Sequence, residues 1–184
     1  MNYAVIKKFD IANGPGVRVS LFVSGCRHKC KNCFNSEAWD FNYGSPMTEE
    51  VEKDILDACS PSHITGLSLL GGEPFEKENR AGLISLTKKF RELYPEKNIW
   101  CYTGFPLDEE LLKSDDEDIS ELLKNIDVLV DGRFEEDLKS ASLLFRGSSN
   151  QRIIDVAETL EKGEVVLLSG KWERTMGSGD IYEA

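Results

Sequence analysis

The sequence contains no apolar run that approaches the ~20 residues needed to cross a bilayer. Its first residues also lack the long apolar segment of a secretory signal. We therefore expect a cytoplasmic protein with no membrane partner. At 184 residues, of which 40% are hydrophobic, the chain is about the length of one domain and can bury a single core.

Positively charged residues are also few, since the chain has 22 Lys and Arg residues but 33 Asp and Glu residues, and its formal net charge is -11. Proteins that bind a nucleic-acid backbone usually carry a clustered basic surface, so we expect no nucleic-acid partner. Net charge also keeps a protein soluble, and the acidic residues 115–118 have the composition of a solvated turn.

Cysteines are too few and too unevenly placed for a disulfide framework. The chain has five, and Cys26, Cys30 and Cys33 fall close together in one segment. A reducing cytosol keeps such thiols free for metal binding or catalysis. Cys59 and Cys101 have no such spacing, and we expect both to be structural.

No internal repeat or low-complexity tract suggests a solenoid or a linker. Short apolar runs predict strands at residues 3–9, 17–23, 66–70, 98–102, 127–130 and 165–168. Helices are predicted at residues 48–59, where Thr48 is the cap, and at residues 79–93 and 108–123. Strands that alternate with helices indicate an α/β fold with a mainly parallel sheet, whose ligands bind at the carboxyl ends of the strands.

The three clustered cysteines follow a predicted strand and have the spacing C-x3-C-x2-C. A cubane iron-sulfur cluster contains four irons, so three cysteines leave one iron without a protein ligand. That iron is then open to a small molecule, which is what catalysis at a cluster requires.

Two alternatives compete with this interpretation. The first is a zinc knuckle made by Cys26, Cys30, Cys33 and His28. Those four ligands would be cramped, because structural zinc sites usually pair ligands from two separated elements. The second alternative is three unrelated core cysteines.

The cysteine loop resembles that of the radical S-adenosylmethionine enzymes, and the resemblance implies that Cys26, Cys30 and Cys33 are the cluster ligands and the catalytic cysteines. It also implies that the open iron of a 4Fe-4S cluster chelates S-adenosylmethionine. In that family an electron from the cluster cleaves the sulfonium, and the resulting 5'-deoxyadenosyl radical abstracts a hydrogen atom. The implied fold is a partial, open TIM-like barrel, because a complete barrel takes ~250 residues.

One position departs from the usual family pattern, which has an aromatic residue immediately before the third cysteine. Asn32 stands there, and Phe34 follows the cysteine instead. The arrangement of residues 30–35 resembles the anaerobic ribonucleotide reductase activases in particular. It implies that Asn32, Cys33 and Phe34 line the cofactor.

Gly71, Gly72 and Glu73 follow the predicted strand at residues 66–70. A Gly-Gly pair on its own is usually a turn. Placed after this strand, the segment resembles the family's Gly-Gly-Glu motif for the methionine amino group, and glycines allow a ligand to approach the main chain closely. We therefore expect Gly71, Gly72 and Glu73 to bind S-adenosylmethionine.

Four further segments resemble activase signatures: Asn-Gly-Pro-Gly-Val-Arg at residues 13–18, Tyr-Thr-Gly at 102–104, Asp-Gly-Arg-Phe at 131–134 and Phe-Arg-Gly-Ser-Ser-Asn-Gln-Arg at 145–152. Trp39 and Phe41 match as well, and we expect them to pack in the core. Arg133 and Arg146 either hold a cofactor carboxylate or ribose, dock a peptide, or form surface ion pairs.

The resemblance implies one activase domain over residues 1–184, with a C-terminal tail from about residue 158 in which residues 177–179 are expected to be mobile. Its function would be to generate a glycyl radical on the catalytic subunit of an anaerobic ribonucleotide reductase. Since no second cluster is indicated, flavodoxin or ferredoxin would supply the electron. The alternatives are an activase of another glycyl-radical enzyme such as pyruvate formate-lyase, a small-molecule radical S-adenosylmethionine enzyme, and an electron-carrier or zinc-binding module.

Overall fold

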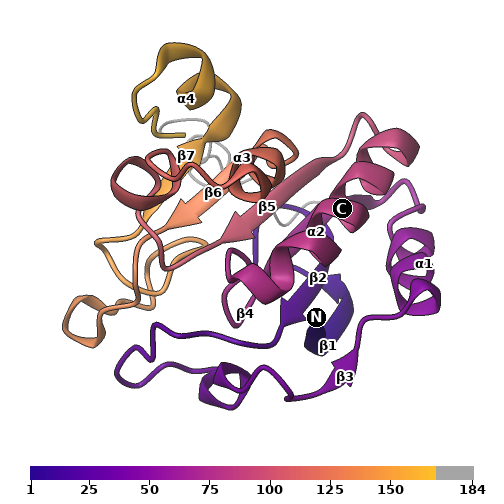
Figure 1. Cartoon of the computed structure of the whole chain (residues 1–184), viewed down its shortest axis with the longest axis horizontal. Helices are drawn as coiled ribbons and strands as arrows, with labels where there is room; N and C mark the ends of the chain where they lie inside the picture. Colours follow the sequence, from indigo (N-terminus) through magenta and orange to yellow (C-terminus); the bar gives the residue numbers. More distant parts are fainter. Residues whose placement is uncertain (169–184) are drawn as a thin grey trace.

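A computed structural model describes residues 1–168, and within them seven strands form one open, mixed sheet (Figure 1). The strands are β1 (Asn2–Asp10), β2 (Val17–Val23), β3 (Ser45–Pro46), β4 (Ile64–Gly71), β5 (Asn98–Tyr102), β6 (Val128–Asp131) and β7 (Arg152–Asp155). Their order is β3-β1-β2-β4-β5-β6-β7, in which β2, β4, β5 and β6 are parallel. β1, β3 and β7 extend the sheet by antiparallel pairing. The predicted α/β class is confirmed.

Five of the six predicted strands are confirmed, with bounds that differ by two residues at most. The strand predicted at residues 165–168 was wrong. This segment lies beside β7 through two backbone hydrogen bonds, yet only Leu167 forms a bridge, with Ile154. β3 and β7 were not predicted, because a strand of two or four residues with polar ends carries little hydrophobic pattern.

The helices are α1 (Glu49–Ala58), α2 (Lys77–Leu93), α3 (Glu117–Lys124) and α4 (Val156–Lys162). Thr48 caps α1 as predicted, since its side chain accepts a hydrogen bond from the Val51 N–H. α4 lies in the tail region for which no helix was predicted. No helix within residues 1–168 is long and apolar enough to span a membrane. The predicted mobile segment at residues 177–179 lies outside the described residues.

The single helix predicted at residues 108–123 was wrong, because the segment divides into a π-helical turn (Leu107–Leu111) and α3. Ser114 accepts a hydrogen bond from the Asp116 N–H, and the Asp116 carboxylate accepts one from the Asp118 N–H. Short polar side chains of this kind compete with helical hydrogen bonding. Asp116 also forms an ion pair with Arg80 on α2, which fixes the break against the neighbouring helix.

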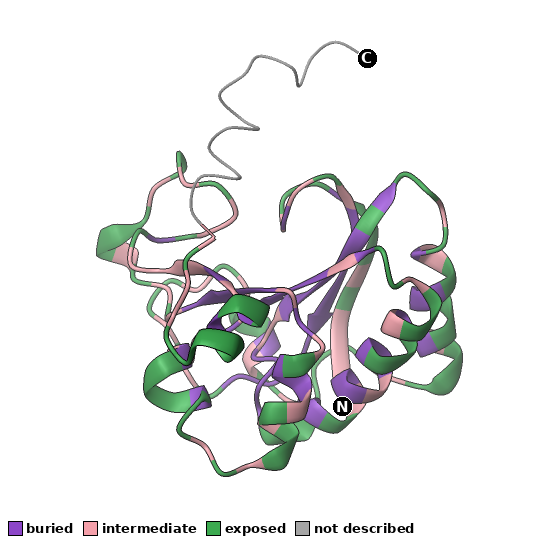
Figure 2. Cartoon of the chain, turned by 90° about the horizontal axis from the view of Figure 1, so that it is seen from above, coloured by how far each residue is buried: buried purple, intermediate pink, exposed green. Residues whose placement is uncertain are grey.

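The main core lies between the helices and one face of the sheet (Figure 2). Alternate strand residues point to this side, so that β2 contributes Val19, Leu21 and Val23. The buried residues that α1, α2 and α3 contribute include Ile55, Leu56, Leu83, Leu86, Phe90, Leu122 and Leu123. Cys59 and Cys101 are fully buried in the same core, as expected of structural cysteines.

The other face of the sheet is covered by loops. A second cluster forms there around Trp100, Val128 and Val130, and Phe145 from the loop after β6 packs on it. This face is therefore covered by the segments that follow the strands. Those segments contain the motifs found in the sequence.

Arg18 is fully buried on the loop-covered face and holds the turn at residues 13–18 in place. Its Nε donates to Ser68 Oγ over 2.7 Å, and Ser68 Oγ donates to the Asn13 carbonyl over 2.6 Å. Its Nη1 donates to Asn98 Oδ1 and its Nη2 to the Leu67 carbonyl, each over 2.8 Å. Burial lowers the pKa of Arg18 to about 10, so the guanidinium still carries its charge at neutral pH. The Asn-Gly-Pro-Gly-Val-Arg motif thus positions Asn13 above the sheet.

Candidate functional site

A cavity of about 430 Å³ lies where β2, β4, β5 and β6 end. Each of these strands leads directly into a cavity segment, and the segments supply Cys26, Gly72, Thr103 and Gly132. The volume is in the range of pockets that hold small molecules. The cavity therefore lies at the carboxyl ends of the parallel strands, where ligand binding was expected.

Cys26, Cys30 and Cys33 all line this cavity. The base of their loop is closed by two backbone hydrogen bonds, from Gly25 N–H to the Ala38 carbonyl and from Cys26 N–H to the Trp39 carbonyl. Burial raises the pKa of the Cys26 thiol to about 11 and also raises that of Cys30. Both therefore stay protonated until a metal displaces the proton.

The residue before each of the two later cysteines has a left-handed backbone. Lys29 has φ 49° and Asn32 has φ 55°. At Asn32 the chain makes a turn, which a hydrogen bond from the Cys33 N–H to the Cys30 carbonyl closes. Asn is among the few residues other than Gly that adopt this conformation at low cost. Asn32 therefore suits this backbone conformation, and it is among the residues that line the cavity.

Substitutions at Asn32 should separate its backbone role from any contact with a ligand. Asn32→Gly keeps the left-handed conformation accessible, so we expect iron retention equal to that of the wild type. Asn32→Ala should lose iron to a chelator about five- to thirtyfold faster, because alanine, unlike Gly or Asn, pays roughly 1–2 kcal/mol in this conformation. Iron remaining after timed exposure to the chelator is the measurement, and equal retention by both variants would contradict the conformational role.

Gly71 and Gly72 are required by close packing of the main chain. A Cβ on Gly71, whose φ is 108°, would lie 2.7 Å from the backbone of Phe22 and Val23. A Cβ on Gly72 would lie 2.5 Å from the Gly25 carbonyl oxygen. The two glycines thus bring the end of β4 against the base of the cysteine loop, and both line the cavity.

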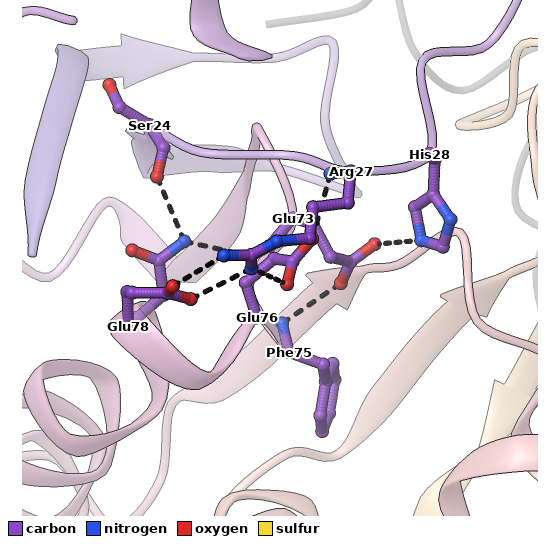
Figure 3. A network of polar contacts seen from close by, with 8 residues as sticks. Ser24, Arg27, His28, Glu73, Phe75, Glu76 and Glu78 are labelled. Atoms are coloured by element: carbon purple, nitrogen blue, oxygen red, sulfur yellow. Dashed lines mark hydrogen bonds and ion pairs between the residues drawn. The ribbon is translucent and has the colours of Figure 1, made fainter. Parts of the chain in front are cut away.

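Glu73 joins three segments of the site through one buried carboxylate, and Figure 3 shows its contacts with His28 and Phe75. Oε1 accepts hydrogen bonds from the Phe75 N–H at 2.9 Å and the Thr103 hydroxyl at 2.8 Å. Oε2 accepts from the Gly104 N–H at 2.7 Å and lies 3.0 Å from His28 Nε2. Because the carboxylate only accepts, His28 donates at this nitrogen. Glu73 therefore connects the cysteine loop to the end of β5.

A second carboxylate holds the same loop one residue earlier (Figure 3). Glu76 is largely buried, and one of its oxygens accepts a hydrogen bond from the Arg27 N–H over 2.8 Å. The Arg27 guanidinium pairs with Glu76 and with Glu78, and lies 4.3 Å from the centre of the Phe41 ring. This arrangement anchors the first turn of the cysteine loop to the start of α2.

The remaining predicted residues fall at the cavity to different degrees. Phe34 lines it but is 85% exposed. Trp39 lines the cavity, so the expectation that it packs in the core was wrong. Arg146 also lines the cavity, whereas Arg133 is exposed, and neither forms an ion pair within residues 1–168.

Two buried polar atoms of the cavity residues have no hydrogen-bond partner within residues 1–168: the Tyr102 hydroxyl and Arg146 Nε. Burial raises the pKa of Tyr102, so its hydroxyl remains a donor. Buried polar groups are normally paired, and these two are suited to the polar groups of a bound ligand. Asn13, the first residue of the Asn-Gly-Pro-Gly-Val-Arg motif, lines the cavity as well. So do Ala12 and Lys139, which sequence reasoning did not identify.

The zinc alternative depends on His28, whose surroundings do not suit it. The side chain is 5% exposed, its Nε2 bonds to Glu73, and its ring meets that of Phe105 at 4.3 Å. Within residues 1–168 no group of three His, Cys, Asp or Glu side chains is placed to hold a single metal ion.

Comparison with known proteins identifies the family. A family model for a 4Fe-4S single cluster domain matches residues 12–154. An anaerobic ribonucleoside-triphosphate reductase-activating protein from Escherichia coli K12 is 43% identical over 153 residues, which cover 82% of this chain and 96% of the relative. The chain belongs to this family of activating proteins. Members from Pasteurella multocida and enterobacteria phage T4 are 43% and 40% identical, over 83% of this chain and 96% and 93% of theirs.

Membership of the activating-protein family agrees with the geometry. The matched residues 12–154 contain all four strand-end segments that form the cavity. The chain has a 4Fe-4S single cluster domain, and Cys26, Cys30 and Cys33 are the cysteines within it that share the cavity. This domain assignment replaces the zinc alternative.

Proposed function

We propose that the protein is an activating enzyme that uses a 4Fe-4S cluster and S-adenosylmethionine to generate a glycyl radical on an anaerobic ribonucleotide reductase. The relatives named as activating proteins of this reductase support the proposal. The observation that carries it is the arrangement of three cysteines on one loop, all facing a cavity at the carboxyl ends of parallel strands.

Cys26, Cys30 and Cys33 would each bind one iron and leave the fourth iron for the amino and carboxylate groups of S-adenosylmethionine. When bound, the cluster and S-adenosylmethionine supply a one-electron cleavage that yields a hydrogen-abstracting radical. The chain contributes the walls of the cavity. Tyr102 and Arg146 line it and carry buried polar atoms that have no partner within residues 1–168, while Phe34 and Trp39 contribute aromatic surface.

The substrate side of the proposal rests on the open sheet. We infer that the domain, residues 1–184, is a partial barrel of the radical S-adenosylmethionine type, whose open side admits a peptide loop of the reductase. Glycine is the suitable target, because its Cα radical is flanked by an amide nitrogen and a carbonyl that delocalise the spin. No other residue lacks the side chain that would hinder approach to that carbon.

The reducing electron comes from another protein in this proposal. Cys59 and Cys101 lie in the main core between the sheet and the helices and do not line the cavity. They are therefore placed as core residues and not as ligands of a second cluster. Flavodoxin or ferredoxin is the donor we propose, and the catalytic subunit of the reductase is the acceptor of the radical.

Electron paramagnetic resonance tests this function directly. The anaerobically reconstituted and reduced protein, mixed with S-adenosylmethionine and the reductase catalytic subunit, should produce the doublet of a glycyl radical. A sample with pyruvate formate-lyase in place of the reductase should remain silent. A cluster-loaded protein that cleaves S-adenosylmethionine but yields no doublet with the reductase would contradict the proposal, and a doublet with pyruvate formate-lyase alone would favour the other activase.

A further inference from the structure

The cysteine loop carries exposed cations that are not among the residues lining the cavity. Cys26, His28, Cys30, Asn32 and Cys33 line the cavity. The residues between them at positions 27, 29 and 31 are Arg, Lys and Lys, and all three are exposed. The exposed part of the loop outside the cavity therefore carries basic residues, in a chain whose net charge is -11.

Of these three cations, Arg27 alone forms an ion pair within the described residues. Arg27 is paired with Glu76 and Glu78. Lys29 and Lys31 have neither an ion pair nor a side-chain hydrogen bond in the part of the chain that the structure describes. The free positive charge of the loop thus belongs to Lys29 and Lys31, which we call the lysine face.

The backbone at Lys29 gives an independent reason to look for a function there. Its φ of 49° is a left-handed conformation that a long side chain adopts only at a cost, and Gly or Asn would adopt it more readily. Strained conformations of this kind concentrate at functional sites. The backbone conformation at this position therefore does not account for a lysine there.

We propose that the lysine face is the docking surface for an acidic one-electron carrier protein that reduces the cluster. This inference rests on the proposed function. A carrier that docks here reaches the loop of the three cysteines from outside, while the cavity stays free for S-adenosylmethionine and the reductase peptide. One electron leaves the reduced flavin or iron-sulfur centre of the carrier and enters the cluster, and no covalent bond forms or breaks.

Charge complementarity selects this class of partner. Two proteins of net negative charge repel at long range, so a local positive surface decides which orientation leads to a productive encounter. On this chain the lysine face supplies such a surface at the cysteine loop. Steering of this type acts on the association rate and weakens as salt shortens the screening length.

The test measures how fast a fully reduced flavodoxin of strongly negative charge reduces the cluster, followed by the change in visible absorption. In low salt, Lys29→Gln combined with Lys31→Gln should lower the second-order rate constant about tenfold, and the difference should vanish near 0.5 M salt. Lys29→Arg combined with Lys31→Arg should keep the wild-type rate. Lys124→Gln is the matched control, because Lys124 is an exposed lysine at the end of α3, towards the amino end of β6.

Three further measurements distinguish docking of the carrier from a general effect on cluster reduction and from a role in binding the reductase. Dithionite, which needs no docking surface, should reduce the wild type and the double glutamine variant equally fast. Affinity for the reductase catalytic subunit should be unchanged, whereas affinity of the cluster-free protein for flavodoxin should fall. The inference would be overturned if the double glutamine variant were reduced by flavodoxin as fast as the wild type. It would also be overturned if reduction by dithionite slowed by the same factor, or if the variant lost affinity for the reductase and kept its affinity for flavodoxin. Because flavodoxin binding is measured without a cluster, failure of the proposed function would be recognised separately.

Discussion

Replacing Cys26, Cys30 or Cys33 by alanine should leave a protein that folds but holds almost no iron after anaerobic reconstitution. The wild type should bind about four irons per chain, and each variant well under one, because two remaining thiolates cannot retain a cubane against loss to solvent. S-adenosylmethionine cleavage and glycyl radical formation should fall to background in all three. Iron analysis and the visible spectrum of the anaerobic protein are the measurements.

Cys59→Ala and Cys101→Ala are the matched controls for this experiment. Both thiols are fully buried in the main core and do not line the cavity. Each substitution should cost roughly 1 kcal/mol of stability, as a typical core truncation does, while iron content stays at the wild-type level. A full complement of iron in any of the three loop variants would mean that another side chain replaces the lost thiolate, and the open-iron proposal would then fail.

The parallel part of the sheet was predictable because each strand is a short apolar run bounded by turn residues. β2 and β5 were predicted to the residue, since both are rich in the β-branched and aromatic residues that favour strands. The rule that ligands lie at the carboxyl ends of such strands, together with the motif resemblance, indicated the segments after them, and the cysteine loop, Gly72 and Thr103 line one cavity.

The helix at residues 108–123 failed because amphipathic spacing continues through a segment whose side chains bind their own backbone. Ser114 and Asp116 end one helical segment and begin the next, and periodicity does not register such local hydrogen bonds. The acidic turn noted at residues 115–118 was the available signal for this break.

The contacts that hold the cysteine loop were beyond the reach of sequence reasoning. His28 was considered only as a zinc ligand, since its partner Glu73 is 45 residues away and nothing local indicates the pairing. Likewise, Arg27 and Glu76 meet only after β4 has been placed beside β2. Motif resemblance identified which residues gather at the site, whereas their mutual contacts required the fold.

Glu73→Gln should be nearly as damaging as Glu73→Ala, although it changes one atom and removes no volume. Each carboxylate oxygen accepts a main-chain N–H, from Phe75 on one side and Gly104 on the other. In either orientation the new amide group therefore points its NH₂ at a buried donor. Thr103 and His28 can reorient or change tautomer, but a main-chain N–H cannot.

The expected cost of Glu73→Gln follows from that mismatch. Leaving a buried donor unpaired costs ~1–3 kcal/mol, and the facing NH₂ group is a second such donor. A total of about 3 kcal/mol would lower the melting temperature of the cluster-free protein by about 6–12 °C for a domain of this size. Iron retention should fall as well, because His28 loses its partner and the cysteine loop its attachment to the end of β5. Glu92→Gln makes the same chemical change at an exposed carboxylate near the end of α2 and should alter neither quantity appreciably.

Melting of the cluster-free protein separates two roles for Glu73. If its carboxylate served only to bind the amino group of S-adenosylmethionine, the glutamine variant would melt like the wild type and lose only cofactor affinity. If the carboxylate positions the cysteine loop, the glutamine variant loses thermal stability even without a cofactor, and its affinity for S-adenosylmethionine falls as a consequence. The four donors that already surround the carboxylate favour the second outcome. An unchanged melting temperature together with full iron retention would show that the cysteine loop keeps its conformation without this attachment.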